Sequence, residues 1–600
     1  MSIFKARFMK NFIKISVLFS IFWAGFSCNK LEDFLDKAPG VDVTEDNIFT
    51  SRQNAESYVS TLYQYGMVSI FPNRDAAVIS SPTGASSSLA GTLSGATDES
   101  ENEANFPFAQ QWNSASIIPG NIIGNEDSKY HGRWKAIRNA NILLERIDEV
   151  PDADDTYKIQ VKGEAQFIRA LSNFETLKRY GGFPIVNKRF VTVEEAKVPR
   201  ASLEECVNFI LKDCDDAVAN LPASYPPTQR GRATKVAALA LKSRTLLYAA
   251  SPLFNTGTPF ISMANAADNK LICYGNMDNN RWKLAADAAK AVLDAATEAG
   301  VALIDVPANR DPAIATVAQG NYRVAWERQD NTEIIIADKT YPASSRFGFP
   351  WYHLYPVPMG SFWVSNTATL NFVRKYEKKA DGLPQTWNPA GGDDLVAKYN
   401  ELDPRFKQTV GYNGARFNAE HPIIETFAGG KHEKNCFGGA WVIKHIPEGL
   451  ANGGSVVPSI ALYRLNEFYL NYAEAINEFQ GPTPEAYAAV NTIRTRSGMP
   501  DLPPGLSKDE FRIRVRNERD IELAFEDHRF WDIRRWLIAE QEGVMKGAIQ
   551  GIKITKLTAT TFRYVPYLIE TRSFNKQMYL HPFDLTEVLK GNLVQNPGWE

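Results

Sequence analysis

Two glutamates in the C-terminal third, Glu522 and Glu526, have the spacing that paired catalytic carboxylates would need on a helix. Four positions put both side chains on one helical face, and two carboxyl groups carry out the acid and base steps of glycoside hydrolysis. Glycosidase carboxylates, however, flank the sugar across a cleft, and Arg519 and Arg529 are spaced to pair with these glutamates. We therefore favour a salt-bridged helix and keep a surface glycosidase as the less favoured alternative.

Metal and cofactor motifs are the next candidates for chemistry. The seven histidines are scattered, no H-E-x-x-H occurs, and nothing near His432 and Cys436 completes a metal set. The stretch 97–103, T-D-E-S-E-N-E, offers hard oxygen ligands for Ca²⁺, although a solvated acidic loop is the favoured interpretation. No G-x-S-x-G, P-loop or G-x-G-x-x-G is present. The sequence therefore predicts no catalytic residue, no metal and no cofactor.

Aromatic residues give the strongest binding signal. They make up 12% of the chain, with 12 Trp and 23 Tyr, and flat rings cover the apolar faces of sugars while Asn, Asp or Arg satisfy the hydroxyls. Two aromatic stretches, 106–112 and 347–363, are broken by Pro or Gly, which disfavours an ordinary helix face. Rings that plug the core remain the alternative. The candidate ligand-binding residues are Phe108, Trp112, Trp351, Tyr352, Tyr355 and Trp363.

The elements that must position these rings read as mainly helical. A first helix is expected over Thr44–Tyr65, and the scaffold of tetratricopeptide-like helix pairs over about 131–300 and 461–540. Regions 66–130 and 301–460 are irregular, with short extended segments such as Glu333–Ala337 and Ala440–Ile443, and are expected to face the ligand. The expected helices are Trp134–Ile147, Ile159–Tyr180, Leu203–Leu221, Thr234–Ala250, Arg281–Ala299, Tyr463–Phe479 and Pro484–Arg496.

The N-terminus is typical of a secretory signal. Residues 1–14 are basic without an acid, residues 15–26 form a short apolar run, and Ser27-Cys28 follows. Removal of residues 1–27 before Cys28 would resemble a bacterial lipoprotein, in which acyl chains on that thiol anchor the protein; a plain signal peptide is the alternative. Cys206 and Cys214 are expected to be buried thiols. A net charge of −3 gives no basic field for nucleic acid.

Several motifs of the mature chain resemble those of the SusD/RagB outer-membrane nutrient-binding lipoproteins. Glu518–Trp536 is similar to the family's E-R-x-x-E-L-x-x-E-G-x-R-x-x-D-L-x-R-W, with Asp527 in place of Gly, and Asn596–Trp599 is similar to its N-P-G-Y ending. The likeness spans nearly the whole mature chain, residues 28–600, as one domain. Its other carriers are Gly163–Leu171, Gly231–Lys235, Tyr463–Ala475 and Asn491–Gly498.

The resemblance implies a helical-pair fold, a cell-surface location in the outer membrane, and no enzymatic activity. It also implies capture of an oligosaccharide, or alternatively a peptide, for a SusC-like TonB-dependent β-barrel transporter. Trp363 lies upstream of Phe372 and Tyr376 as a ligand Trp does in the starch-binding member of the family. By the same resemblance, Trp351 or Tyr352 is the second ligand ring, and Phe108 or Trp112 is the third.

Overall fold

The computed structural model describes residues 45–68, 91–105, 107–339, 354–360, 364–450 and 460–600, together with the backbone of 344–345 and 455–456. Described residues 45–58 with 148–153 form one compact unit, and 59–147 with 154–600 form another. In the first unit the backbone amide of Arg52 donates to the Asp152 carboxylate at 2.6 Å. The chain is described below within the second unit unless stated otherwise.

The helix expected over Thr44–Tyr65 is interrupted, so that prediction was wrong in its continuity. Helix α3 covers Glu45–Ile48, and α4 covers Arg52–Gly66. The Thr50 hydroxyl and the Asn54 amide both donate to the backbone carbonyl of Asn47, each at 2.8 Å. These side chains occupy the carbonyl that a continuous helix would use, which ends the first helix and starts the second.

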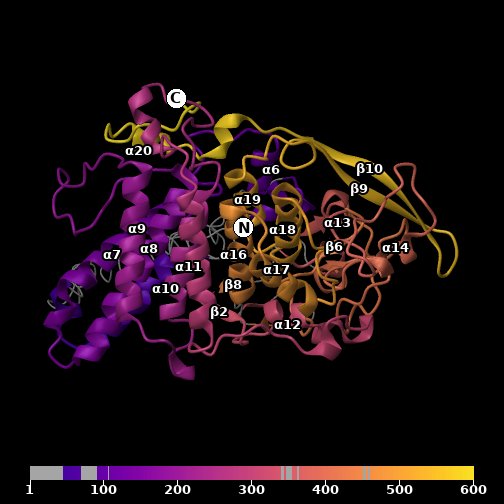
Figure 1. Ribbon diagram of the computed structural model, residues 1–600, viewed down its shortest axis with the longest axis horizontal. Coiled ribbons are helices and arrows are strands. Elements are labelled where there is room, and N and C mark those ends of the chain that lie inside the picture. The colour runs from indigo at the N-terminus through magenta and orange to yellow at the C-terminus, as the bar shows by residue number, and fades with distance from the viewer. Residues whose placement is uncertain are drawn as a thin grey trace, which may run out of the picture. The chain divides into compact units, whose positions relative to one another are not determined.

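A row of antiparallel helices forms the scaffold, which confirms the predicted mainly helical fold of helix pairs. Each helix packs against the next in the row, and α11 packs directly against α16 although irregular segments separate them in sequence. Figure 1 shows α7 to α11 side by side and α16 to α18 beyond them. The members are α7 (Tyr130–Arg146), α8 (Asp155–Tyr180), α9 (Leu203–Asn220), α10 (Lys235–Ala250), α11 (Asn280–Ala296), α16 (Leu465–Gln480), α17 (Pro484–Arg496) and α18 (Lys508–Glu522).

Local sequence sets the helix starts and the close approach of the helices. Ser202 and Ser507 each form a capping box with the Glu three residues later, which satisfies amides that the helix leaves unpaired. Pro484 occupies the first turn of α17, where its missing N–H costs nothing. A Cβ added at Gly163 would meet Leu221 at 2.8 Å, so a larger residue there would force α8 away from the end of α9.

The irregular regions contain short strands where extended segments were predicted. Strand β2 (Ile334–Asp338) pairs with β8 (Ile460–Arg464), and β6 (Trp441–Val442) lies inside a four-stranded sheet of order β1-β4-β6-β5. Short helices lie between the strands. The remaining elements are β1 (Ser100–Asn102), β4 (Asn366–Ala368), β5 (Val410–Gly411), β3 (Ser344–Ser345), β7 (Ser455–Val456), α6 (Phe108–Asn113), α12 (Asn321–Glu327), α13 (Leu370–Val373), α14 (Leu395–Glu401) and α15 (Phe406–Thr409).

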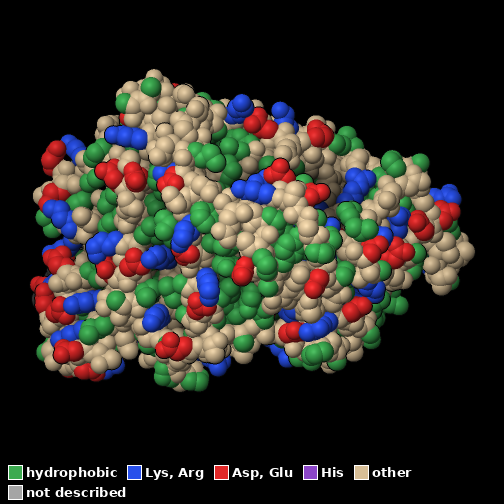
Figure 2. Space-filling view, viewed as in Figure 1, with side chains coloured by type: hydrophobic (Ala, Val, Ile, Leu, Met, Phe, Trp, Pro, Cys, Tyr) green, Lys and Arg blue, Asp and Glu red, His purple; other side chains and the backbone are tan. Residues whose placement is uncertain are grey.

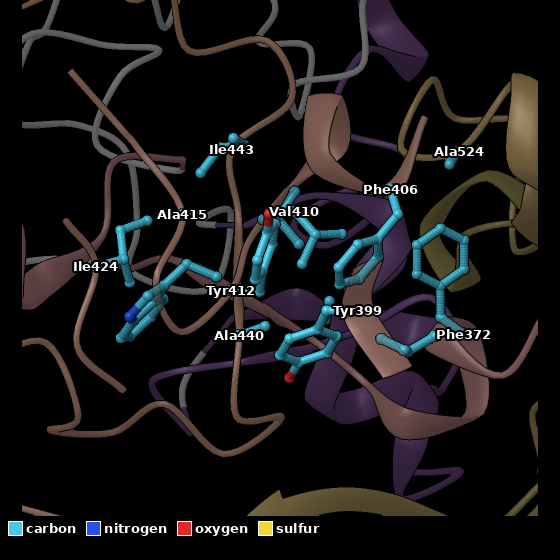
Figure 3. Packing of buried hydrophobic residues seen from close by; sticks show 14 of the residues in the cluster. Phe372, Tyr399, Phe406, Val410, Tyr412, Ala415, Ile424, Ala440, Ile443 and Ala524 are labelled. Carbon is cyan, nitrogen blue, oxygen red and sulfur yellow. The ribbon is translucent and has the colours of Figure 1, made fainter. Parts of the chain in front are cut away.

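A large aromatic core supports that sheet. The rings of Tyr399, Phe406 and Tyr412 contact one another, with centroid distances of 4.9 to 5.1 Å, and Phe372 packs nearby (Figure 3). Rings in such contacts bury large apolar areas and fix one another's orientation. The irregular region around residues 354–450 therefore has a packed hydrophobic core of its own.

A long hairpin near the C-terminus was not predicted. Strands β9 (Gly547–Lys556) and β10 (Phe562–Arg572) pair antiparallel with a register shift between Leu568 and Glu570. The residues on both sides of the turn are rich in Ile, Thr, Val and Tyr, and this composition is typical of strands. The hairpin follows α19 (Arg529–Arg535) and precedes α20 (Leu585–Val588). It supplies one wall of the site described next.

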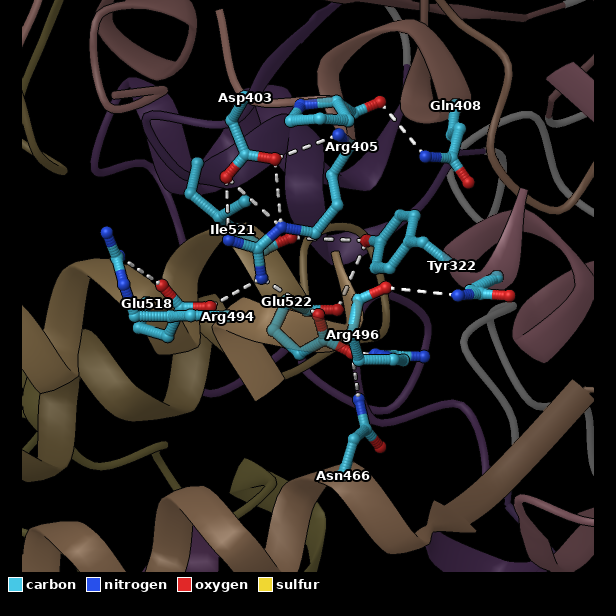
Figure 4. Close-up of polar contacts among 12 residues, drawn as sticks. Tyr322, Asp403, Arg405, Gln408, Asn466, Arg494, Arg496, Glu518, Ile521 and Glu522 are labelled. Carbon is cyan, nitrogen blue, oxygen red and sulfur yellow. Dashed lines mark hydrogen bonds and ion pairs between the residues drawn. The ribbon is translucent and has the colours of Figure 1, made fainter. Parts of the chain in front are cut away.

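The acidic and basic residues around α18 form a buried salt-bridge network, as favoured from the sequence. Glu522 accepts hydrogen bonds from Arg405 at 2.9 Å, from Asn466 at 2.7 Å, and from Arg496. Glu518 accepts from Arg405 at 2.6 Å and joins the same cluster (Figure 4). All of these side chains are buried. The network ties α18 to segments more than a hundred residues away in sequence.

The partners expected for Arg519 and Arg529 were wrong. Arg519 donates to Asp532 at 2.6 Å, and Arg529 binds Asp98 and Asp520, each at 2.7 Å. Arg519 lies within α18, but Glu522 is already bound by Arg405 and Arg496. For Arg529 the reason is that α18 ends at Glu522, after which Phe525 and Asp527 adopt positive φ values of 62° and 67°. The chain reverses there, so helical spacing does not apply beyond Glu522.

Candidate functional site

Three of the rings predicted to bind ligand are buried, so their assignment as exposed stacking surfaces was wrong. Phe108 is 2% exposed, Trp112 is 1% exposed and Tyr355 is fully buried. Pro107 does not break a helix but precedes α6, a position that proline tolerates. Phe108 and Trp112 are then four residues apart on one helical face, and that face is turned to the core.

Contacts around these rings confirm the alternative reading of core packing for them. The guanidinium of Arg534 lies 4.5 Å from the Trp112 ring centroid, and Phe530 meets the same ring edge-on at 5.4 Å. The Tyr355 hydroxyl accepts from Asn418 at 3.2 Å. A side chain sealed in this way has no face to offer a ligand.

The remaining residues predicted to bind ligand or lipid lie outside the described residues. They are Trp351, Tyr352, Trp363 and Cys28, and for them the sequence predictions stand untested. Cys206 and Cys214 are buried thiols, as expected from their place on α9.

An open hollow of about 680 Å³ lies where three distant parts of the chain meet. Glu101 on β1 and Gln110 on α6 form one side, the loop at Asn435 forms a second, and strand β10 forms the third. The Tyr567 hydroxyl donates to the carbonyl of Phe437 at 2.7 Å, which joins the second and third sides. The lining residues are Glu101, Asn102, Glu103, Ala104, Asn105, Gln110, Asn435, Phe437, Tyr567, Ile569 and Glu570.

The base of the hollow is held by a buried arginine. Arg572 donates to Glu101 at 2.6 Å and to Glu570 at 2.5 Å. It also donates to the backbone carbonyls of Thr97 and Ser100 at 2.5 and 3.1 Å. Its side chain is fully buried. Its guanidinium therefore fixes the two carboxyl groups and the turn that leads into β1.

The two carboxyl groups at the base have pKa values shifted in opposite directions. Burial raises the pKa of Glu101 to about 8, with Arg572 opposing and Glu570 adding to the rise. Burial acts to raise the pKa of Glu570 as well, but the hydrogen bond with Glu101 and the charge of Arg572 outweigh it and lower that pKa. Burial therefore favours the protonated form of Glu101, whereas the bond with Glu101 and the charge of Arg572 favour the charged form of Glu570.

Two half-buried rings and several polar groups face the opening. Phe437 and Tyr567 are neither sealed nor fully exposed. Gln110 donates to Glu101 at 2.5 Å, and the Asn435 amide donates to Glu103. Rings of this kind can cover the apolar face of a sugar, while fixed amides and carboxylates bind its hydroxyls. The hollow thus offers both features that the sequence analysis sought, on different residues.

Sequence reasoning missed this site because it read residues 97–103 as a solvated loop. That reading was wrong: Asp98, Glu99 and Glu101 are each at most 3% exposed. Asp98 pairs with Lys375 at 2.8 Å, and Glu99 accepts from the Phe525 amide at 2.9 Å. The signal that could have revealed the site was the high density of carboxylates in this stretch. If such a cluster is buried, its acids need basic partners from elsewhere in the chain.

A second hollow, of about 50 Å³, lies among charged residues that include Lys178, Asp527 and His528. It has room for a few water molecules but not for a sugar ring. Within the residues described, no three His, Cys, Asp or Glu side chains are placed to hold a metal ion. None of the helices in that same portion of the chain is long and apolar enough to cross a membrane. The larger hollow is the candidate binding site.

Mixed charge covers the face of the molecule shown in Figure 2. Lys and Arg side chains alternate with Asp and Glu over the helices of the scaffold, and green apolar side chains lie between them. On that face no area of one sign dominates. The hollow, by contrast, is lined by three glutamates and by no Lys or Arg among its described lining residues.

Comparison with known proteins places the chain in a family. Residues 332–599 match the model described as the SusD family, and residues 33–247 match the model described as starch-binding associating with outer membrane. Among curated proteins, SusD-like protein P38 of Formosa agariphila is 22% identical over 544 residues, covering 88% of this chain and 92% of the relative. SusD-like protein P25 of the same organism is 20% identical, covering 89% and 91%.

Solved structures agree in fold. A SusD-like protein from Bacteroides fragilis is 26% identical with a TM-score of 0.71, covering 94% of this chain and all of that one. A laminarin-binding SusD-like protein is 18% identical with a TM-score of 0.58, covering 92% of this chain and all of that one. Together with the two family models, these matches show that the chain belongs to the SusD/RagB family.

Proposed function

We propose that this protein binds a glycan in the hollow between β1, the Asn435 loop and β10, and delivers it to a TonB-dependent β-barrel transporter. The observation that carries the proposal is the convergence of two accessible rings, Phe437 and Tyr567, with carboxylates and amides around about 680 Å³ of open space. The laminarin-binding relative of the same fold supports a glycan as the ligand. Delivery to a transporter rests on the family resemblance.

We further propose that the protein is not an enzyme. The carboxyl groups of Glu101 and Glu570 are both held by the single guanidinium of Arg572. Glycosidase carboxyl groups stand about 5 to 10 Å apart with the sugar between them. Glu522 and Glu526, the other candidate pair, are bound to arginines in the interior. Neither pair can flank a glycosidic bond in these positions.

The first test is calorimetry with a glycan panel and a peptide panel on wild type and Tyr567→Ala. We expect a glycan to bind with a Kd in roughly the micromolar to millimolar range, because sugar hydroxyls exchange water bonds for protein bonds with little net gain. Loss of the Tyr567 ring should weaken binding about tenfold, equivalent to roughly 1.4 kcal/mol. Tyr567→Phe, which keeps the ring and loses only the bond to Phe437, should bind nearly as wild type.

Leu568→Ala is the matched control for that test, since Leu568 is the next residue on β10 and is 54% exposed. It should leave glycan affinity unchanged. If Tyr567→Ala bound glycan as tightly as wild type, the hollow would not be the glycan-binding site. If peptides bound in place of glycans, the protein would be a peptide-capturing member of the family. Trp351→Ala and Trp363→Ala test the rings predicted from sequence in the same titration.

We propose that Cys28 carries the lipid that anchors the protein to the outer membrane, with the chain exposed at the cell surface. The basic n-region, the apolar run and Ser27-Cys28 support this. In Cys28→Ser the protein should move almost entirely from the membrane fraction to the soluble fraction, as measured by fractionation and immunoblotting. Retention of the variant in the outer membrane would mean that another feature anchors it.

A further inference from the structure

The hollow differs in charge from the mixed-charge face shown in Figure 2. Three carboxyl-bearing residues line it, Glu101, Glu103 and Glu570, and no Lys or Arg is among its described lining residues. The nearby cation, Arg572, is fully buried and donates to protein acceptors from all three of its nitrogens. It therefore cannot bind an anionic group of a ligand without losing bonds that build the site.

The charges do not cancel at the opening. Glu101 and Glu570 are both bound by the buried guanidinium of Arg572, whereas Glu103 has no Lys or Arg beside it among the described lining residues. Glu103 is only half-buried and sits at the rim, where its backbone amide is fixed to the Ser365 carbonyl at 2.8 Å. An acidic sugar in the hollow would meet this charge at close range in a partly desolvated space, where repulsion is stronger than in water.

The hydrogen-bonding groups have the same bias. Gln110 and Asn435 each donate a side-chain N–H to Glu101 and Glu103, so these donors are engaged within the protein, while the carboxylate oxygens of the lining remain acceptors. A sugar hydroxyl or amine donates to such oxygens. A uronate or sulfate group brings only acceptors, so it would leave acceptors facing acceptors.

Two lysines near the hollow do not alter this balance. Lys553 on β9 holds its ammonium 5.0 Å from the Tyr567 ring centroid, and Lys434 precedes Asn435. Both side chains are exposed and neither is a lining residue. Their charges are screened by solvent and salt, whereas the half-buried carboxylate of Glu103 is screened less.

From this geometry we propose that the site selects glycans that are uncharged or carry amines at the sugar contacting Glu103, and rejects glycans that carry carboxylate or sulfate there. The proposal rests on the hollow being the glycan site proposed above. It assigns Glu103 as the residue that discriminates by charge, a role distinct from the stacking role of Tyr567.

The test compares one polymer in two charge states. Affinity electrophoresis in native gels first identifies an uncharged polysaccharide that retards the protein, from a panel of laminarin, starch, glucomannan and galactomannan. That polymer is then oxidised at its primary hydroxyls to carboxylates, which changes the charge and keeps the backbone. We expect the oxidised polymer to bind at least tenfold more weakly at low salt, and the difference to shrink as salt is raised.

Variants assign the effect to one residue. Glu103→Gln should recover part of the lost affinity for the oxidised polymer, and Glu103→Lys should recover more, while both keep the unfolding temperature of wild type. Glu194→Gln, whose side chain is 82% exposed on a distant loop, is the control and should behave as wild type. Failure of both Glu103 variants to recover any affinity would overturn the assignment of Glu103.

The outcomes also separate this inference from the proposed function. Equal affinity of wild type for the oxidised polymer, or retention by polygalacturonate, alginate or chondroitin sulfate in place of uncharged polymers, would overturn the charge selection while leaving glycan binding intact. Absence of retention by every polysaccharide, charged or uncharged, would overturn the proposed function and the inference with it.

Discussion

Glu522→Gln is expected to lower the free energy of unfolding by about 3 to 5 kcal/mol, the range measured when one member of a buried ion pair is removed. Glu522 is fully buried and accepts from Arg405, Arg496 and Asn466. Glutamine keeps the shape but removes the charge, so two buried guanidinium groups lose a counter-ion. Urea unfolding followed by circular dichroism measures the change.

The control for that prediction is Asp509→Asn on the same helix. Asp509 pairs with Arg512 at the surface, where its side chain is 82% exposed, and such pairs contribute little to stability. Its unfolding midpoint should match wild type. A Glu522→Gln variant as stable as wild type would contradict the view that the network fixes α18 to the rest of the molecule. If instead it folded normally and lost a glycan-cleaving activity of the wild type, the glycosidase alternative would be revived.

Arg572→Met is expected to damage both the fold and the binding site. The substitution leaves Glu101 and Glu570 without their buried cation and the carbonyls of Thr97 and Ser100 without a donor. We expect a loss of roughly 3 to 5 kcal/mol in unfolding free energy and loss of measurable glycan binding. Arg563→Met, on the same strand with an exposed pair to Asp393, should be unchanged in both measurements.

The pH dependence of this variant has a predicted sign. Arg572 lowers the pKa values of both Glu101 and Glu570, so its removal raises both in the folded state. A carboxyl group whose pKa is raised on folding stabilises the fold below its unfolded pKa and loses that contribution as pH rises through the folded pKa. The stability deficit of Arg572→Met should therefore be larger at pH 8 than at pH 5. A deficit independent of pH would mean that the two carboxyl groups are not held by Arg572.

The helical scaffold could be predicted from sequence because its signals are local. Helix α17 begins at Pro484 and ends at Arg496, as its periodicity and the capping Thr483 indicate. Strand β6, Trp441–Val442, lies inside an expected extended segment, and β2, Ile334–Asp338, overlaps the other and ends one residue beyond it. Each of these elements is specified by residues within about a dozen positions. Their side-chain periodicity and caps agree with the final fold.

The binding site could not be predicted in the same way because its parts are distant in sequence. Asn435 bonds to Glu103, 332 residues away, and Arg572 bonds to Glu101, 471 residues away. The aromatic signal was also ambiguous: Phe108 and Trp112 beside a proline fit an exposed loop and a helix start equally well. Only the fold decides that these rings face inward while Phe437 and Tyr567 face the hollow.

The most direct test of the account is a crystal structure of the protein with the oligosaccharide that binds most tightly in calorimetry. We expect sugar density in the hollow, with one ring stacked on Tyr567 and a hydroxyl donating to Glu103. Sugar bound at another surface, with that hollow free of ligand at full occupancy of the other site, would contradict it.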